Sequence, residues 1–277
     1  MGIRILCAVI VLSLFACGGG GSDGAQPPGG SSNPPPQAPA PQQPLPPASA
    51  PPLPANEISL LFMGNSHTSY NNLTAMVVDM VRAANPGKTV SRVEAPGFLF
   101  LEERYRDPDT LALLRRQSWN FVVLQAQKYS TSGLYDYSTE EAKALIRMSR
   151  EQRAVPVLFP EWPRKNIDET RRIYDLHAAI AQAEPACVAP IGQAWDLALS
   201  RYPTLPLHSA DENHSAPAGA FLAALVLYAT ITGQSPLDVP PMPQYPVDLG
   251  LQETLRGIAA EAVQVVPPRM WCPADVP

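Results

Sequence analysis

The chain has 277 residues, a formal net charge of −5 at pH 7 and 33 prolines. It contains no run of lysines and arginines, so the electrostatic footprint of a nucleic-acid-binding protein is missing and nucleic acid is not an expected partner. Beyond the N-terminus, no segment approaches the ~18–20 consecutive apolar residues of a transmembrane helix. Residues 56–277 are long enough for one domain with a substantial hydrophobic core.

Residues 1–16 have the features of a bacterial secretion signal. Arg4 supplies a positive charge, and residues 5–15 are almost wholly apolar but too short to span a bilayer as a mature helix. The segment that ends at Cys17 resembles a lipobox, in which the cysteine becomes the lipidated first residue of the mature protein. An ordinary signal peptide cut nearby and an uncleaved anchor are the alternatives. Gly18 rather than Asp after this cysteine favours the outer membrane, so we expect a cell-envelope protein attached only through its lipid anchor.

Residues 17–55 are rich in Gly, Ser, Gln, Ala and Pro and carry almost no charge. Such a composition cannot bury enough apolar surface to offset the entropy of ordering, and we expect a disordered tether. Two cysteines remain beyond it, Cys187 and Cys272. In an oxidising compartment this pair predicts a disulfide that attaches the C-terminal tail to the domain, and two separate buried thiols are the alternative.

The domain, residues 56–277, alternates short apolar runs with amphipathic segments. Strands are predicted at residues 58–63, 89–95, 121–124, 155–159 and 186–189. Helices are predicted at residues 72–84, 110–116, 138–152, 168–183, 193–201, 216–232 and 252–265, with Ser138 and Glu141 at the spacing of a capping box. This alternation predicts an α/β fold in which helices cover both faces of a parallel sheet.

Gly64-Asn65-Ser66 directly follows the first predicted strand. Ligands of open α/β sheets bind outside the carboxyl ends of the strands, so the Ser66 hydroxyl would lie at the mouth of the sheet. Its N–H would lie near a helix N-terminus, which favours negative charge. The alternative is that Ser66 or Ser69 only caps the helix that follows.

Asp211 and His214 stand three residues apart, shortly before a long Ala/Leu-rich helix. In a turn or a first helical turn this spacing lets the carboxylate accept from one imidazole N–H, while the other ring nitrogen faces a hydroxyl. The alternative is a polar loop in which Asp211 or Ser215 caps the helix.

Together these two segments resemble the SGNH/GDSL hydrolase family over nearly all of residues 56–233. The resemblance implies a flavodoxin-like three-layer α/β/α sandwich with a mostly parallel five-stranded sheet. It implies Ser66 as nucleophile, His214 as general base and then acid, and Asp211 as the residue that orients His214. The G-x-S-x-G elbow of the α/β-hydrolase fold is missing, which argues against that other serine-hydrolase scaffold.

The resemblance also implies an oxyanion hole. The N–H groups of Ser66 and Gly97 would be two of its donors. The family places an asparagine after its third strand, where this chain has Leu124-Gln125-Ala126-Gln127. A glutamine amide can donate as asparagine does, so Gln127 or Gln125 is predicted as the third donor. This departure, and Asn65 where GDSL enzymes have Asp, indicate a variant branch with G-N-S and L-Q-x-Q signatures.

Other residues are weaker candidates. Trp162, Phe98, Tyr129 and Tyr135 could form an aromatic platform for a sugar ring, or could simply pack loops. His67 is expected at the pocket rim, His177 on a solvent-facing side of its helix and His208 in a loop. No His/Cys/Asp cluster has metal-ligand spacing, so neither a metal nor another cofactor is predicted.

The preferred interpretation is a monomeric esterase that removes a short acyl group, typically acetyl, from a small acyl ester or an acylated glycan. A lipase, lysophospholipase or thioesterase of the same fold is the second interpretation. The third is a non-catalytic lipoprotein that binds a glycan or an envelope partner, an interpretation that the unusual oxyanion segment favours.

Overall fold

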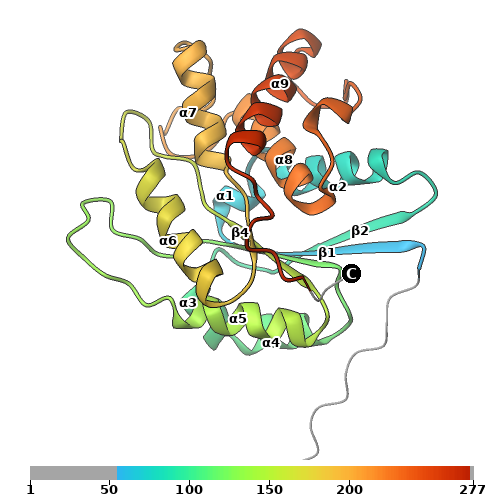
Figure 1. The fold of residues 1–277 in the computed structure, drawn as a ribbon, viewed down its shortest axis with the longest axis vertical. Helices are drawn as coiled ribbons and strands as arrows, with labels where there is room; N and C mark the ends of the chain where they lie inside the picture. The colour runs from blue at the N-terminus through green and yellow to red at the C-terminus, as the bar shows by residue number, and fades with distance from the viewer. Residues whose placement is uncertain (1–54, 275–277) are drawn as a thin grey trace, which may run out of the picture. The chain divides into compact units, whose positions relative to one another are not determined.

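A computed structural model describes residues 55–274. The signal peptide and lipidated Cys17, and the tether apart from Ala55, lie outside the described residues, and their assignments stay predictions. The described part contains a five-stranded sheet in the order β2-β1-β3-β4-β5, in which all neighbouring strands are parallel (Figure 1). The strands are β1 (Glu57–Met63), β2 (Thr89–Glu94), β3 (Phe121–Gln125), β4 (Val155–Phe159) and β5 (Cys187–Val188). The predicted α/β class, parallel sheet and strand positions are confirmed.

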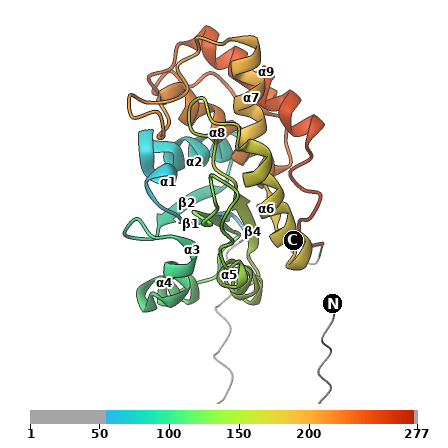
Figure 2. The ribbon, with the colours of Figure 1, turned by 90° about the vertical axis from the view of Figure 1, so that its left-hand side faces the viewer.

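Helices cover both faces of the sheet, as Figures 1 and 2 show from two directions. On one face lie α2 (Leu73–Ala84), α7 (Ile191–Arg201), α8 (Pro217–Thr232) and α9 (Leu249–Val265). On the other lie α3 (Leu101–Arg106), α4 (Pro108–Arg115), α5 (Glu140–Glu151) and α6 (Thr170–Ala183). The short elements α1 (Ser66–Ser69) and η1 (Tyr70–Asn72) lead from β1 into α2, and η2 (Pro236–Asp238) follows α8.

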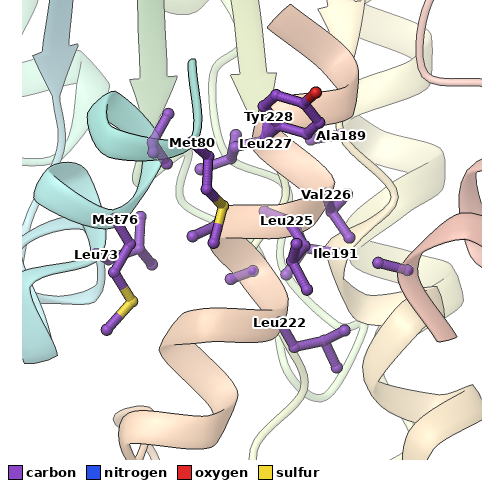
Figure 3. Close-up of a cluster of buried hydrophobic side chains, with 14 of the residues drawn as sticks. Leu73, Met76, Met80, Ala189, Ile191, Leu222, Leu225, Val226, Leu227 and Tyr228 are labelled. Carbon is purple, nitrogen blue, oxygen red and sulfur yellow. The ribbon is translucent and has the colours of Figure 1, made fainter. Parts of the chain in front are cut away.

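Two hydrophobic cores form because successive strand residues point to opposite faces. In β1, Leu60 and Phe62 belong to the core under α2, α7, α8 and α9, whereas Leu61 and Met63 belong to the core under the other helices. Helix α8 is apolar on every side, as expected for a helix buried all round. Figure 3 shows its Leu222, Leu225, Val226 and Leu227 in one buried cluster with Met76 and Met80 of α2 and Ile191 of α7.

Three local features differ from the predictions. Helix α3 was not predicted, because four of its six residues are charged and it has no apolar periodicity. Helix α9 begins at Leu249, where Asp248 accepts from the backbone N–H groups of Gly250 and Leu251. Ser138 forms no capping box, because its hydroxyl donates to the Glu141 carboxylate at 2.5 Å.

The strand order creates a switch point that positions the site. The chain leaves β1 for β2 on one side, and β3 then pairs with β1 on the other side. In sheets of this order, ligands bind outside the carboxyl ends of the two strands that flank this point. The segments after β1 and β3 are those that begin with Gly64 and Ala126.

The predicted disulfide joins Cys187 of β5 to Cys272 in the C-terminal tail, 85 residues later. The Val188 N–H also donates to the Pro268 carbonyl, so the tail adds a backbone contact at the edge of the sheet. The cross-link and this contact hold the tail against β5.

Replacing both cysteines with alanine should lower the free energy of unfolding by about 4–5 kcal/mol, because the unfolded chain regains the entropy of a long open loop. Urea denaturation of the double variant and of the oxidised wild type measures the difference. Reduced wild-type protein serves as the control and should unfold close to the double variant. Equal stability of the variant and the oxidised wild type would contradict the expectation.

Candidate active site

The segment after β1 presents Ser66 at the start of a helix. Asn65 caps α1, because its side-chain oxygen accepts from the His67 N–H at 3.0 Å. The cap is therefore Asn65 and not Ser66 or Ser69. This arrangement leaves the Ser66 hydroxyl free for a contact outside its own helix.

That contact is with His214. The Ser66 Oγ lies 2.7 Å from His214 Nε2, and His214 Nδ1 lies 2.5 Å from Asp211 Oδ2. The structure thus brings the three predicted catalytic residues into one hydrogen-bonded chain. With Nδ1 donating to the carboxylate, Nε2 is the acceptor that faces the serine hydroxyl.

Asp211 is fixed by further donors in a tight loop. Its Oδ1 accepts from the Ser209 hydroxyl at 2.7 Å and from the backbone N–H groups of Asn213 and His214 at 3.0 and 2.9 Å. The hydrogen bonds from His214 first, and then from Ser209, hold the pKa of the Asp211 carboxyl well below its usual range. The carboxylate therefore stays ionised wherever His214 could act as a base.

Aromatic rings hold the His214 imidazole from the sides. It stacks against Tyr70 and His67 with ring centroids 4.5 and 4.9 Å away. His67 is only 7% exposed, and burial followed by the proximity of His214 lowers its pKa to about 4. His67 is therefore a neutral ring at physiological pH, and it lines the cavity beside His214.

A cavity of about 380 Å³ opens at Ser66 and His214. The lining combines the segments after β1, β2, β3 and β4 with the loop that carries His214: Asn65, Ser66, His67, Phe100, Gln127, Lys128, Tyr129, Thr131, Tyr137, Glu161, Arg164, Asn213 and His214. Polar and charged side chains thus line the cavity together with three aromatic rings, those of Phe100, Tyr129 and Tyr137.

The predicted aromatic platform is only partly present. Tyr129 lines the cavity, whereas Phe98 is 68% exposed and neither it nor Tyr135 belongs to the lining. Phe100 and Tyr137 line it instead, and Phe100 carries the Lys128 ammonium over its ring at 4.8 Å.

Trp162 does not reach the cavity, which corrects the sequence interpretation. Only 1% of it is exposed, because its ring stacks on Trp195 with centroids 4.7 Å apart. Its indole N–H donates to the Asn213 carbonyl at 2.8 Å, and its ring packs against His67. Trp162 therefore supports the loop that carries His214 and is not a surface for a sugar ring.

Neither predicted glutamine donates into the cavity. Gln125 is fully buried: its amide oxygen accepts from the Asn65 N–H and its amide nitrogen donates to Glu161. The prediction of Gln125 as an oxyanion donor is wrong, because its buried amide is hydrogen-bonded to Asn65 and Glu161. Gln127 lines the cavity, but its amide nitrogen donates to the backbone carbonyls of Lys128 and Ser138 at 2.9 and 3.0 Å.

Gly97 has a left-handed backbone conformation, with φ of +79°, which favours glycine. It is not part of the cavity lining, and its role as an oxyanion donor stays a prediction. Its carbonyl accepts from Arg104 at 2.7 Å.

Arg104 forms hydrogen bonds with both the segment after β1 and the segment after β2. Its buried guanidinium donates to the carbonyls of Gly64 and Gly97 at 2.6 and 2.7 Å, and to that of Pro96 at 2.7 Å. Burial lowers its pKa, but an arginine remains charged at neutral pH. Sequence reasoning missed this residue, since nothing in a short charged helix indicates which way one arginine points.

The remaining histidines lie away from the cavity. His177 is buried and not solvent-facing as predicted, because α6 turns it inward, where its Nδ1 lies 2.8 Å from the Ile173 carbonyl. His208 is paired with Ser215 in an antiparallel bridge at the base of the Asp211 loop. Among residues 55–274, no three His, Cys, Asp or Glu side chains could hold a metal ion, and no helix is both long and apolar enough to cross a membrane.

No protein-family model matches the chain, and no curated protein matches it by sequence. Among solved structures, the chain is similar to a DUF4886 family protein from Bacteroides uniformis, with 16% identity, a TM-score of 0.58, and 76% of this chain and 96% of that chain covered. This likeness shows a shared fold.

Other similar structures carry hydrolase names. One is a putative SGNH hydrolase from Slackia heliotrinireducens, with 25% identity and a TM-score of 0.48 over 62% of this chain and 98% of that one. Another is the esterase EstA from Pseudoalteromonas sp., with 13% identity and a TM-score of 0.45 over 63% of this chain and 97% of that one.

Replacing Arg104 with methionine should lower the free energy of unfolding by at least about 3 kcal/mol, because several buried carbonyls lose their charged donor at once. Urea denaturation measures this loss. Arg106→Met on the same helix is the matched control: Arg106 is exposed and pairs with Glu141, so its loss should change stability by less than about 1 kcal/mol. Similar urea midpoints for the two variants would contradict a stabilising role for the hydrogen bonds of Arg104.

Proposed function

We propose that the chain is a serine hydrolase of the SGNH type that cleaves a short-chain ester, typically an acetyl ester on a carbohydrate. The observation that carries this proposal is the continuous chain from Ser66 Oγ through His214 to the Asp211 carboxylate at a cavity. Solved structures with hydrolase and esterase names resemble this one, and they agree with a hydrolase of this fold.

The mechanism follows from the order of these groups. His214 Nε2 accepts the Ser66 proton as Oγ attacks the ester carbonyl carbon, and a tetrahedral oxyanion forms. Asp211 stabilises the imidazolium and keeps its orientation. His214 then donates the proton to the departing alcohol, and water, activated by the same imidazole, releases the acid from the acyl-Ser66 ester.

The oxyanion is assigned to backbone donors. The N–H of Ser66 lies at the start of α1 and that of Gly97 in the segment that Arg104 ties to β1. One well-placed donor of this kind contributes about 3–4 kcal/mol to the stabilisation of a transition state. Because the amide nitrogens of Gln125 and Gln127 donate to other groups, these backbone N–H groups are the proposed pair.

The cavity supports a small, polar ester. Its volume of about 380 Å³ lies near the lower end of the usual range of ligand pockets. Phe100, Tyr129 and Tyr137 offer ring faces beside polar groups such as Gln127 and Arg164, a combination that suits a sugar better than an alkyl chain. The proposal includes the envelope location and lipid anchor predicted at Cys17.

Replacing Ser66 with alanine should abolish hydrolysis of p-nitrophenyl acetate and labelling by a fluorophosphonate, with the melting temperature nearly unchanged. Asp211→Asn should keep the fold and lower kcat by about 10⁴-fold, because the imidazole loses the partner that sets its tautomer. Ser69→Ala is the matched control: this exposed serine donates to Glu94 outside the cavity and should keep wild-type activity. Labelling of the Ser66→Ala variant would contradict Ser66 as nucleophile.

A substrate panel should separate the proposed esterase from its alternatives. With the full chain, kcat/KM should fall from p-nitrophenyl acetate to the octanoate and dodecanoate, and acetylated sugars should release acetate. Values that rise with chain length would favour a lipase or thioesterase. A wild-type protein that binds glycans but is neither labelled nor active would favour the non-catalytic interpretation.

A further inference from the structure

Gln125 contacts the turn from Asn65 to Thr68, which carries Ser66. It ends β3, is fully buried, and its Oε1 accepts from the Asn65 N–H at 2.8 Å and the Thr68 hydroxyl at 2.9 Å. These two donors flank Ser66 in the chain. A single amide oxygen therefore holds both sides of the turn that carries the proposed nucleophile.

The other end of the same amide contacts a carboxylate. Gln125 Nε2 donates to Glu161 Oε2 at 2.9 Å, and Glu161 follows β4. The hydrogen bonds thus run from the end of β4, through the end of β3, to the turn after β1. Glu161 also lines the cavity, so this connection extends from the turn that carries Ser66 to the cavity wall.

The orientation of the Gln125 amide decides whether the turn from Asn65 to Thr68 finds a hydrogen-bond acceptor. With its oxygen toward Asn65, both donors of the turn are satisfied. If the amide turned over, its NH₂ group would face the Asn65 N–H, and two donors would meet in a buried space. Glu161 accepts only from the NH₂ end when ionised, and it therefore selects the orientation that holds the turn.

The space around this contact is closed. A Cβ atom at Gly64 would lie 2.1 Å from Thr68 Oγ1 and 2.5 Å from Gln125 Oε1. Backbone, hydroxyl and amide oxygen are therefore closely packed at this end of the Gln125 side chain, and a hydrogen bond lost there is costly because both partners are buried.

We propose that Glu161 is a positioning residue: by holding the Gln125 amide in one orientation, it keeps the turn from Asn65 to Thr68 in place and Ser66 Oγ within reach of His214. This inference rests on the proposed function, because Glu161 would act on the same nucleophile, Ser66, through Gln125. Glu161 itself does not touch the reacting atoms.

The surroundings of Glu161 are compatible with this role over a broad pH range. Tyr129, Glu169 and Arg164 are the titratable groups that act on it, besides the Gln125 amide. Burial raises the pKa of Glu161 to about 7. A neutral carboxyl still offers its carbonyl oxygen to the Gln125 NH₂, and the Asn65 N–H still requires the amide oxygen on its side, so the same orientation is favoured on both sides of that pH.

The test compares two substitutions in the full chain. Glu161→Leu keeps similar bulk but removes the acceptor, and it should lower kcat for p-nitrophenyl acetate by about 10- to 100-fold, with KM within about twofold, because Ser66 is misplaced while the cavity mouth is retained. The rate of fluorophosphonate labelling should fall by the same factor. Glu161→Gln keeps an acceptor of the same length and should retain at least about half of the wild-type rate.

Controls separate positioning from a general loss of structure. Asp196→Ala removes an exposed carboxylate that accepts from Thr170 at 3.0 Å, away from the cavity, and it should leave the rates unchanged. Gln125→Leu should lose activity as Glu161→Leu does, and the double variant should be no worse, because both act through one contact. If Glu161→Leu does not fold, Glu161→Ala takes its place.

The outcomes distinguish this inference from the proposed function. Wild-type labelling rates in Glu161→Leu, or equal losses in Glu161→Leu and Glu161→Gln, would overturn the positioning role while leaving a working hydrolase. Independent losses that add in the double variant would overturn it as well. An inert wild-type protein would instead contradict the proposed function itself.

Discussion

The site depends on how the carboxyl ends of four parallel strands, β1 to β4, are held together. The backbone leaves the sheet at these ends, so its carbonyls lose their ladder partners and need other donors. Arg104 supplies donors to the segments after β1 and β2, and Gln125 joins the segment after β1 to β3 and, through Glu161, to β4. The turn that carries Ser66 is thus held from two directions by buried side chains.

Charge is distributed unevenly between the two acids near Ser66. Asp211 lies in an exposed loop and is ionised because four hydrogen bonds favour the carboxylate. Burial raises the pKa of Glu161 more than its hydrogen bond from Gln125 lowers it. The first acid can stabilise a cation on His214, whereas the second accepts a hydrogen bond from the Gln125 amide. The different environments suit the two carboxyl groups to different tasks.

The sequence alone predicted all five strands, most of the helices and the three residues of the Ser66–His214–Asp211 chain, because these rest on local patterns. A strand followed by Gly-Asn-Ser, and an Asp and His three residues apart before a helix, can be read from neighbouring residues. Arg104, Gln125 and Trp162 could not be assigned this way. Their roles depend on partners that lie on other strands or loops, such as Gly64, Asn65 and Asn213. The error over His177 has a similar cause, since one histidine on a mixed helix face does not reveal which neighbours cover it.

Because the amide nitrogens of Gln125 and Gln127 donate to other groups, the proposed oxyanion site relies on backbone N–H donors. A side-chain amide can move into place when a substrate binds, but backbone N–H groups are only as well placed as their turns. If Ser66 and Gly97 supply the donors, catalytic geometry depends on the rigidity of two turns and not on a mobile side chain. Arg104 contacts the carbonyl of one turn and the start of the other, so one buried cation sets the distance between them. An oxyanion site without a side-chain amide donor would then depend on the residues that hold these two backbone segments in place.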